Sequence, residues 1–191
     1  KDIAALSTAQ AAGLSTTVLS NLSTAQLKAI ETKDIAAMST TQLGALTTAQ
    51  IGILATAQIA ALSSTQIGSL GAKFTTGQIS ALSTAQAAGV STTTMAALST
   101  AQLAAISTKD IAAMSTAQLG ALSTTSFAAL KTAQITAMST AQVGALAANM
   151  STTQIGALTV AQTAGLSTTV LGSLSTTQLQ AISTKEIAAL S

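Results

Sequence analysis

The chain has 191 residues and a net charge of +2; 48% of its residues are hydrophobic, 6% are charged and 1% are aromatic. It contains no His and no Cys, which excludes disulfides, thiolate metal sites and serines activated by an imidazole. The seven basic residues are scattered and no apolar run approaches ~18 residues, so we expect neither nucleic-acid binding nor a membrane span.

An eight-residue repeat, the octad, runs through the chain. Position 1 is large and apolar, position 2 is Ser or Thr, position 3 is Thr, position 5 is Gln, position 6 is again large and apolar, and positions 7 and 8 are small, as in residues 98–105. A fixed period indicates a stack of identical units. Position 1 falls, in chain order, at Leu6, Leu14, Leu22, Ile30, Met38, Leu46, Leu54, Leu62, Leu70, Phe74, Leu82, Val90, Leu98, Ile106, Met114, Leu122, Leu130, Met138, Leu146, Met150, Leu158, Leu166, Leu174, Ile182 and Leu190.

The octad slips by four residues at two places, with inserts at 71–74 and 147–150. The slips define a super-repeat of 76 residues, because the same dipeptide pattern starts at Lys33, Lys109 and Lys185. We therefore expect residues 1–191 to form a single repeat array of about two and a half super-repeats. Since the array begins and ends in mid-pattern without capping repeats, we expect it to be a fragment of a longer chain.

Each octad carries the start signal of a helix. In Ser23-Thr24-Ala25-Gln26, the Ser side chain can accept the N3 amide while the Gln side chain reaches back to the Ser amide, which is a capping box. The Leu, Ile and Ala that follow form helices readily. One continuous helix would rotate its apolar stripe by about 80° per octad, so we expect a break at each position 2. The prediction is an all-α solenoid of short Ser-capped helices.

A β-solenoid is the alternative fold, since Thr, Ile and Val favour strands and short parallel coils also have fixed periods. Against it, positions 1 and 6 are five residues apart and would point to opposite faces of a straight strand. The Gly, Asn and Asp residues that mark the turns of β-coils are also sparse. The pattern favours helices.

Positions 1, 6 and 8 are expected to form a thin core, because small residues at position 8 let neighbouring helices approach closely. Each insert is expected to extend a helix by about one turn, giving helices of about eleven residues over 65–74 and 140–150 against about six elsewhere. The alternative is that the inserts form loops, as Gly71 indicates.

We expect no catalytic, cofactor-binding or metal-binding residue in this chain. Its most distinctive polar marks are the Lys-Asp and Lys-Glu dipeptides, which we interpret as a charge ladder that registers one chain against another in a fibre. Alternatively, they mark a surface position that tolerates charge and keeps the rod soluble. The residues of this possible inter-chain ladder are Lys33, Asp34, Lys109, Asp110, Lys185 and Glu186.

Position 3 carries Thr in almost every octad, and regular Thr arrays resemble those of ice-binding proteins. That alternative predicts that Thr100, Thr108, Thr116 and Thr124 project outward on one nearly flat face. A helical superhelix would instead distribute these threonines around its outside or turn them toward neighbouring caps. The simplest interpretation is that Thr packs its methyl group on a neighbour and assists the cap.

The runs Ala-Leu-Ser-Thr-Ala-Gln at 81–86 and 97–102 resemble repetitive segments of large bacterial secreted proteins described as adhesin-like or haemagglutinin-like exoproteins. The resemblance implies an extracellular or cell-surface location and a role as a stalk or filament, and it transfers no catalytic residue. We therefore expect a non-enzymatic structural protein that self-associates into an extracellular filament, stalk or adhesin shaft, without a cofactor or a small-molecule substrate. Ice binding by the Thr ladder is the alternative.

Overall fold

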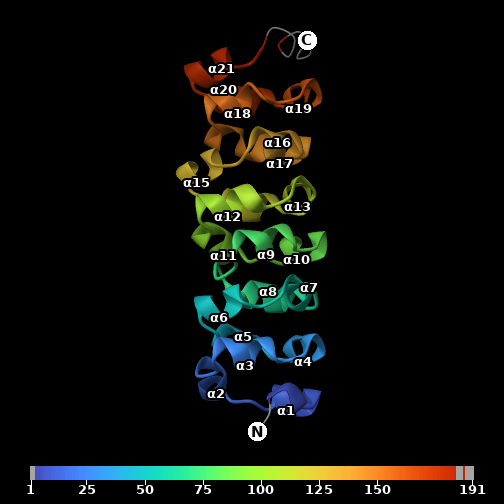
Figure 1. Cartoon of the computed structure of the whole chain (residues 1–191). Helices are drawn as coiled ribbons and strands as arrows, with labels where there is room; N and C mark the ends of the chain where they lie inside the picture. The colour runs from blue at the N-terminus through green and yellow to red at the C-terminus, as the bar shows by residue number, and fades with distance from the viewer. Residues whose placement is uncertain (1–2, 184–186, 188–191) are drawn as a thin grey trace. The chain divides into compact units, whose positions relative to one another are not determined.

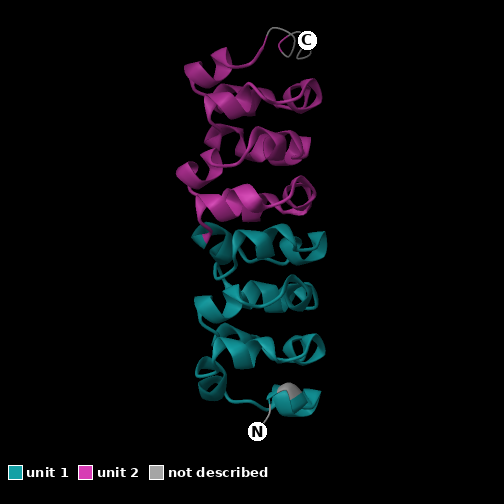
Figure 2. Ribbon diagram, in the orientation of Figure 1, with its two compact units in different colours: residues 1–97 teal, residues 98–191 magenta. Residues whose placement is uncertain are grey.

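The computed structural model describes residues 3–183 and 187, and every regular element in that part of the chain is a short helix (Figure 1). The prediction of an all-α repeat solenoid is confirmed, and the β-solenoid alternative is wrong. The chain divides into two compact units, unit 1 (Lys1–Ala97) and unit 2 (Leu98–Ser191) (Figure 2). Each unit is built from the same capped helices.

Unit 1 starts with a 3-10 helix and continues with α-helices of mostly five residues. Their bounds are η1 Ile3–Ala5, α1 Thr8–Ala12, α2 Thr16–Ser20, α3 Thr24–Lys28, α4 Thr32–Ala36, α5 Thr40–Gly44, α6 Thr48–Gly52, α7 Thr56–Ala60, α8 Ser64–Leu70, α9 Thr76–Ser80, α10 Thr84–Ala88 and α11 Thr92–Ala97.

Unit 2 repeats this arrangement. Its helices are α12 Thr100–Ala105, α13 Thr108–Ala113, α14 Thr116–Gly120, α15 Thr124–Ala128, α16 Thr132–Thr136, α17 Thr140–Leu146, η2 Ala147–Asn149, α18 Thr152–Ile155, α19 Val160–Ala164, α20 Thr168–Ser173 and α21 Thr176–Gln180.

The predicted capping box starts most of these helices. At α1, the Ser7 hydroxyl accepts the Gln10 N–H at 3.3 Å, and Gln10 Oε1 accepts the Ser7 N–H at 2.9 Å. Two backbone donors that a helix start leaves unpaired are satisfied in this way. Where Ala55 occupies the cap position without a hydroxyl, Gln58 Oε1 still accepts the cap N–H at 2.8 Å. Conversely, the Ser15 hydroxyl accepts the Val18 N–H at 3.2 Å at α2, where position 5 holds no Gln, so either side of the box can act alone.

The chain leaves each helix at position 1 and runs extended through position 2. Ser15, for example, has φ −71° and ψ 154°, and the preceding Leu14 N–H closes the last turn of α1 by donating to the Ala11 carbonyl at 3.2 Å. An extended residue at every eighth place breaks the α-helix and redirects the chain. This is the break that the rotation of the apolar stripe predicts.

Within each unit the helices wind so that a helix packs against the third helix along. In unit 1 the contacting pairs include α1 with α4 and α4 with α7, which lie in successive layers of Figure 1. In unit 2 they include α13 with α16 and α14 with α17. Across the inserts a helix packs against the second α-helix along instead of the third, as in α8 with α10 and α17 with α19.

The inserts do not form the long helices that were predicted. At the first insert, α8 has seven residues and ends at Leu70, because Gly71 adopts a φ of +63° that favours glycine. At the second, α17 also has seven residues and continues as the 3-10 helix η2. The prediction of eleven-residue helices is wrong, and the loop alternative describes the first insert. Both paths return an apolar side chain, Phe74 or Met150, to the core.

The core follows positions 1 and 6, as predicted, but not position 8. Leu27 at position 6 and Ile30 at position 1 are buried. At position 8, Ala29 and Ala61 are exposed, and Ala45 is only half-buried. The prediction that position 8 belongs to the core is wrong, since these residues are exposed or half-buried. The third buried position is instead position 5.

Candidate functional site

Glutamine is buried in most of the octads that carry it at position 5, although glutamine is rarely a core residue. Burying an amide without hydrogen bonds costs about 1–3 kcal/mol, so each buried amide needs partners. The buried members are Gln42, Gln50, Gln58, Gln78 and Gln86 in unit 1, and Gln118, Gln134, Gln142, Gln154, Gln162 and Gln178 in unit 2.

Gln42 shows how one amide serves two helices. Its Oε1 accepts the Ser39 N–H at 2.8 Å and so completes the N-terminal cap of α5. Its Nε2 donates to the carbonyls of Leu14 at 2.7 Å and Ala12 at 3.0 Å, at the C-terminal end of α1. The last carbonyls of a helix have no partner within it, so a side chain from the next turn satisfies them. Cap formation and turn-to-turn stacking depend on the same side chain.

The same bond recurs at a constant separation. Gln50 donates to the Leu22 carbonyl at 2.9 Å in unit 1, and Gln134 donates to the Ile106 carbonyl at 2.8 Å in unit 2. The two residues of each pair are 28 residues apart. The bond joins position 5 of one octad to position 1 of the octad three places earlier, in agreement with the packing of each helix on the third helix along. We call this series of Gln amides and position-1 carbonyls the amide ladder.

Across each insert the separation within the amide ladder falls to 24 residues. Gln78 donates to Leu54 at 2.9 Å over the first insert, and Gln154 donates to Leu130 at 3.0 Å over the second. An insert of four residues thus replaces a whole octad in the winding. This is why contacts there join every second helix instead of every third.

At the first insert a lysine takes the place of the amide. Lys73 Nζ donates to the carbonyls of Gly44 and Leu46, each at 2.7 Å. These carbonyls end α5, where the helix dipole also favours a positive charge. The sequence position of Lys73, inside the insert, gives no indication of this role.

The helix pairs that meet across an insert lie unusually close. A Cβ added at Gly89 would lie 2.2 Å from the Ser64 Cβ, and one added at Gly165 would lie 3.0 Å from the Thr140 Cβ. The two glycines are related by the super-repeat, as are Ser64 and Thr140. Glycine at this place permits the packing of α10 on α8 and of α19 on α17.

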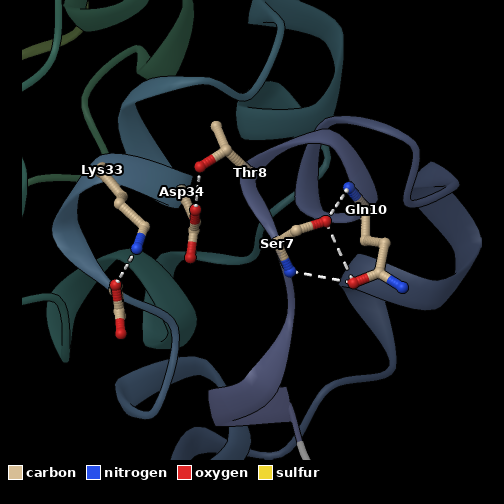
Figure 3. A network of polar contacts seen from close by, with 6 residues as sticks. Ser7, Thr8, Gln10, Lys33 and Asp34 are labelled. Carbon is tan, nitrogen blue, oxygen red and sulfur yellow. Dashed lines mark hydrogen bonds and ion pairs between the residues drawn. The ribbon is translucent and has the colours of Figure 1, made fainter.

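Two carboxylates of the predicted charge ladder, Asp34 and Asp110, point inward. Asp34 is 2% exposed, and its Oδ1 accepts the Thr8 hydroxyl at 2.7 Å (Figure 3). Asp110 is equally buried, and its Oδ2 accepts the Ser107 hydroxyl at 2.7 Å. Both occupy position 5, where a carboxylate cannot donate to a carbonyl as an amide does. Each Asp carboxylate therefore accepts a hydrogen bond from a hydroxyl, where a Gln amide would donate one to a carbonyl.

Two lysines of that ladder, Lys33 and Lys109, point outward. Lys33 is exposed and its Nζ contacts Glu31 Oε2 at 2.6 Å; hydrogen bonding to Glu31, with the charge of this carboxylate, raises the pKa of Lys33. Lys109 is exposed too, whereas Lys185 and Glu186 lie outside the described residues. A ladder between chains needs surface charges, and of the residues described only the lysines of these dipeptides supply them. Pairing between chains stays a prediction.

The threonines at position 3 are exposed but do not share one face. Thr100, Thr108, Thr116 and Thr124 all lie at the surface of unit 2. Because each helix there packs against the third helix along, each octad advances the chain by about a third of a turn. Successive threonines therefore point to different sides, and the prediction of a nearly flat Thr face is wrong.

We searched the described residues for a metal site, a membrane-spanning helix and a ligand pocket. Residues 3–183 contain no group of three or more acidic side chains that could hold a metal ion. No helix in the same range is long and apolar enough to cross a membrane. An open depression in unit 1 is lined by Lys28, Glu31, Ala55 and Gln58, but Gln58 is engaged in the amide ladder and Glu31 in its ion pair.

The fold and the amide ladder define a helical repeat protein. The sequence profile of the ALTTAQ repeat family matches residues 27–64, 43–72 and 90–124, which together cover less than half of the chain. These segments contain the capped octads described above and are similar to that family. No curated protein and no solved structure matches the chain.

Proposed function

We propose that this chain is a non-enzymatic structural protein that forms the shaft of an extracellular filament, stalk or adhesin. The amide ladder carries the proposal. Within each unit, turns are fastened to the preceding ones by the same side-chain bond, as in Gln50 to Leu22 and Gln142 to Met114. A unit that bonds to its neighbour in the same way each time can be repeated to any length.

The use of the polar side chains supports a structural role. The buried glutamines serve caps and turns, and the hydroxyls at position 2 serve caps, so these groups are already engaged in holding the fold. Catalysis by serine needs a neighbouring base, and the chain has no His to provide one. We propose that it uses neither a cofactor nor a small-molecule substrate and does not bind nucleic acid.

Self-association follows from the same composition. Only 6% of the residues are charged and the net charge is +2, so electrostatic repulsion between copies is weak. An extracellular or cell-surface location agrees with the resemblance of the octad to segments of secreted exoproteins. Protease treatment of intact cells that produce the chain tests this location, since a surface protein is cleaved while cytoplasmic markers survive.

Electron microscopy of the purified chain over a concentration series tests the filament. We expect rods or filaments whose length grows with concentration. Dispersed particles of one chain at every concentration would contradict self-association, and with it the proposed filament.

A further inference from the structure

The chain contains two asparagines, and both lie directly before a position-1 residue. A serine follows two residues after each, so Asn21 is paired with Ser23 and Asn149 with Ser151. Both segments therefore match Asn-x-Ser, the acceptor pattern for N-linked sugars. Because position 2 is Ser or Thr in most octads, an asparagine creates this pattern when it stands at this place, and neither asparagine lies elsewhere.

Asn21 is exposed at the end of α2, in the turn that leads to α3. Ser23, the N-cap residue of α3, is exposed as well. Position 8 is also exposed in helices further along unit 1, at Ala37 and Ala61. The exposure of Asn21 is therefore a property of its place in the octad.

The Asn21 side chain is held at the surface with part of its amide unused. Its Nδ2 donates to the Thr17 carbonyl at 2.9 Å, beside the last turn of α2. A carboxamide nitrogen carries two hydrogens, and this bond uses one of them. The other hydrogen can be replaced by a sugar while the first continues to hold the side chain. The Asn21 N–H, which donates to the Val18 carbonyl at 3.1 Å, fixes the turn itself.

Asn149 has the same sequence pattern in different surroundings. It is half-buried and lies in η2, and both α15 and α20 pack against this 3-10 helix. The residue that follows it, Met150, is buried. An N-linked sugar is bulky and hydrated and needs open surface. The structure therefore separates two sites that the sequence pattern does not distinguish.

We propose that Asn21, and not Asn149, is an N-glycosylation site. The donor is a sugar whose anomeric carbon is bonded to a phosphate of a nucleotide or a lipid, and a glycosyltransferase of the producing cell catalyses the transfer. The Asn21 Nδ2 forms a bond to the anomeric carbon, the bond from this carbon to the phosphate oxygen breaks, the phosphate leaves with the electron pair, and one amide proton is released. The inference rests on the extracellular location in the proposed function.

Mass spectrometry of the chain recovered from the surface of the producing cells tests the proposal. We expect an added mass equal to a whole number of sugars, all of it on the peptide that contains Asn21. Asn21→Gln should lose the whole added mass, whereas the matched variant Asn149→Gln should retain it. Ser23→Asp should lose it too, because it removes the acceptor pattern but keeps a good N-cap residue for α3. Circular dichroism of the variants confirms that the helices persist.

The size of the added mass identifies the donor. Single sugars indicate a nucleotide donor, whereas a fixed oligosaccharide transferred as a block indicates a lipid donor. A chain at the cell surface with unmodified Asn21, or with Asn149 modified to the same extent, would overturn this inference and leave the structural role standing. A chain that stays inside the cell would overturn the proposed location and this inference with it.

Discussion

The side-chain amide of Gln142 joins its own helix to Met114, which lies 28 residues earlier in the sequence. Its Nε2 donates to the Met114 carbonyl at 2.6 Å, and its Oε1 accepts the Ser139 N–H, also at 2.6 Å. One buried side chain therefore satisfies a donor at the start of α17 and an acceptor at the end of α13. Local helix formation and stacking of turns are coupled through it, which explains why so short a helix is stable only within the array.

The first prediction concerns this coupling. Gln142→Glu keeps the cap acceptor but turns a buried carboxylate toward carbonyls that need a donor. We expect the free energy of unfolding to fall by about 3 kcal/mol, measured by urea denaturation. Gln26→Glu is the matched control, since Gln26 has the same cap but an exposed and unused Nε2; its effect should stay within about 0.5 kcal/mol. Equal losses in both variants would show that only the cap matters.

A second prediction concerns the lysine that replaces an amide. Lys73→Met leaves the carbonyls of Gly44 and Leu46 without their donor while keeping the aliphatic length of the side chain. We expect a loss of about 1–3 kcal/mol in thermal or chemical unfolding. Lys28→Met removes a charge from an exposed side chain and should be nearly neutral. If Lys73→Met is equally neutral, the two carbonyls find other partners and the proposed role of Lys73 is wrong.

A third prediction concerns a hydroxyl with no partner. Thr163 occupies position 6, is fully buried, and its Oγ1 makes no hydrogen bond within the described structure. Thr163→Val removes that hydroxyl at nearly constant volume and should stabilise the chain by about 1–2 kcal/mol. Thr132→Val, at an exposed position 3, should change the unfolding midpoint little. A destabilised Thr163→Val variant would mean that the hydroxyl has a partner after all.

The octads show which features of the fold a local sequence pattern can predict and which it cannot. The capping box predicts where α1 or α3 starts, because its partners lie three residues apart, and the spacing of positions 1 and 6 predicts the apolar core. The burial of Gln42 could not be predicted in this way, because its partner Leu14 is 28 residues away. That distance depends on the number of octads per turn, which no local pattern encodes.

The inserts and the charged dipeptides also differ from expectation because contacts between turns, distant in sequence, decide their structure. A pattern of four extra residues is compatible with a longer helix, but the position of Phe74 in the core requires a turn at Gly71 instead. Asp34 resembles a solvated surface charge until position 5 is known to face the preceding turn. The exposed lysines, in contrast, are where composition alone places them.

A fourth prediction tests ice binding. The threonines at position 3 are exposed but successive ones lie on different sides of the winding, so Thr100, Thr108, Thr116 and Thr124 form no single flat array to match a crystal lattice. We expect no thermal hysteresis from the intact chain in a nanolitre osmometer, and no change in Thr108→Lys/Thr116→Lys. Hysteresis that disappears in this double variant would restore the Thr ladder as a binding surface.

The last prediction uses two glycines with opposite surroundings. Gly89 lies against Ser64, where an added Cβ would come within 2.2 Å of the Ser64 Cβ, so Gly89→Ala must push α10 away from α8. Overpacking of this kind costs about 1–3 kcal/mol. Gly144 lies inside α17 with nothing within 4 Å of its added Cβ, so Gly144→Ala should stabilise the helix by up to about 1 kcal/mol. Ser64→Gly should restore part of the stability lost in Gly89→Ala, because it removes the clashing atom. Urea denaturation measures the change in the free energy of unfolding for each variant. If Gly89→Ala and Gly144→Ala change it in the same direction, or if Ser64→Gly rescues nothing, close packing across the insert is not the reason for Gly89.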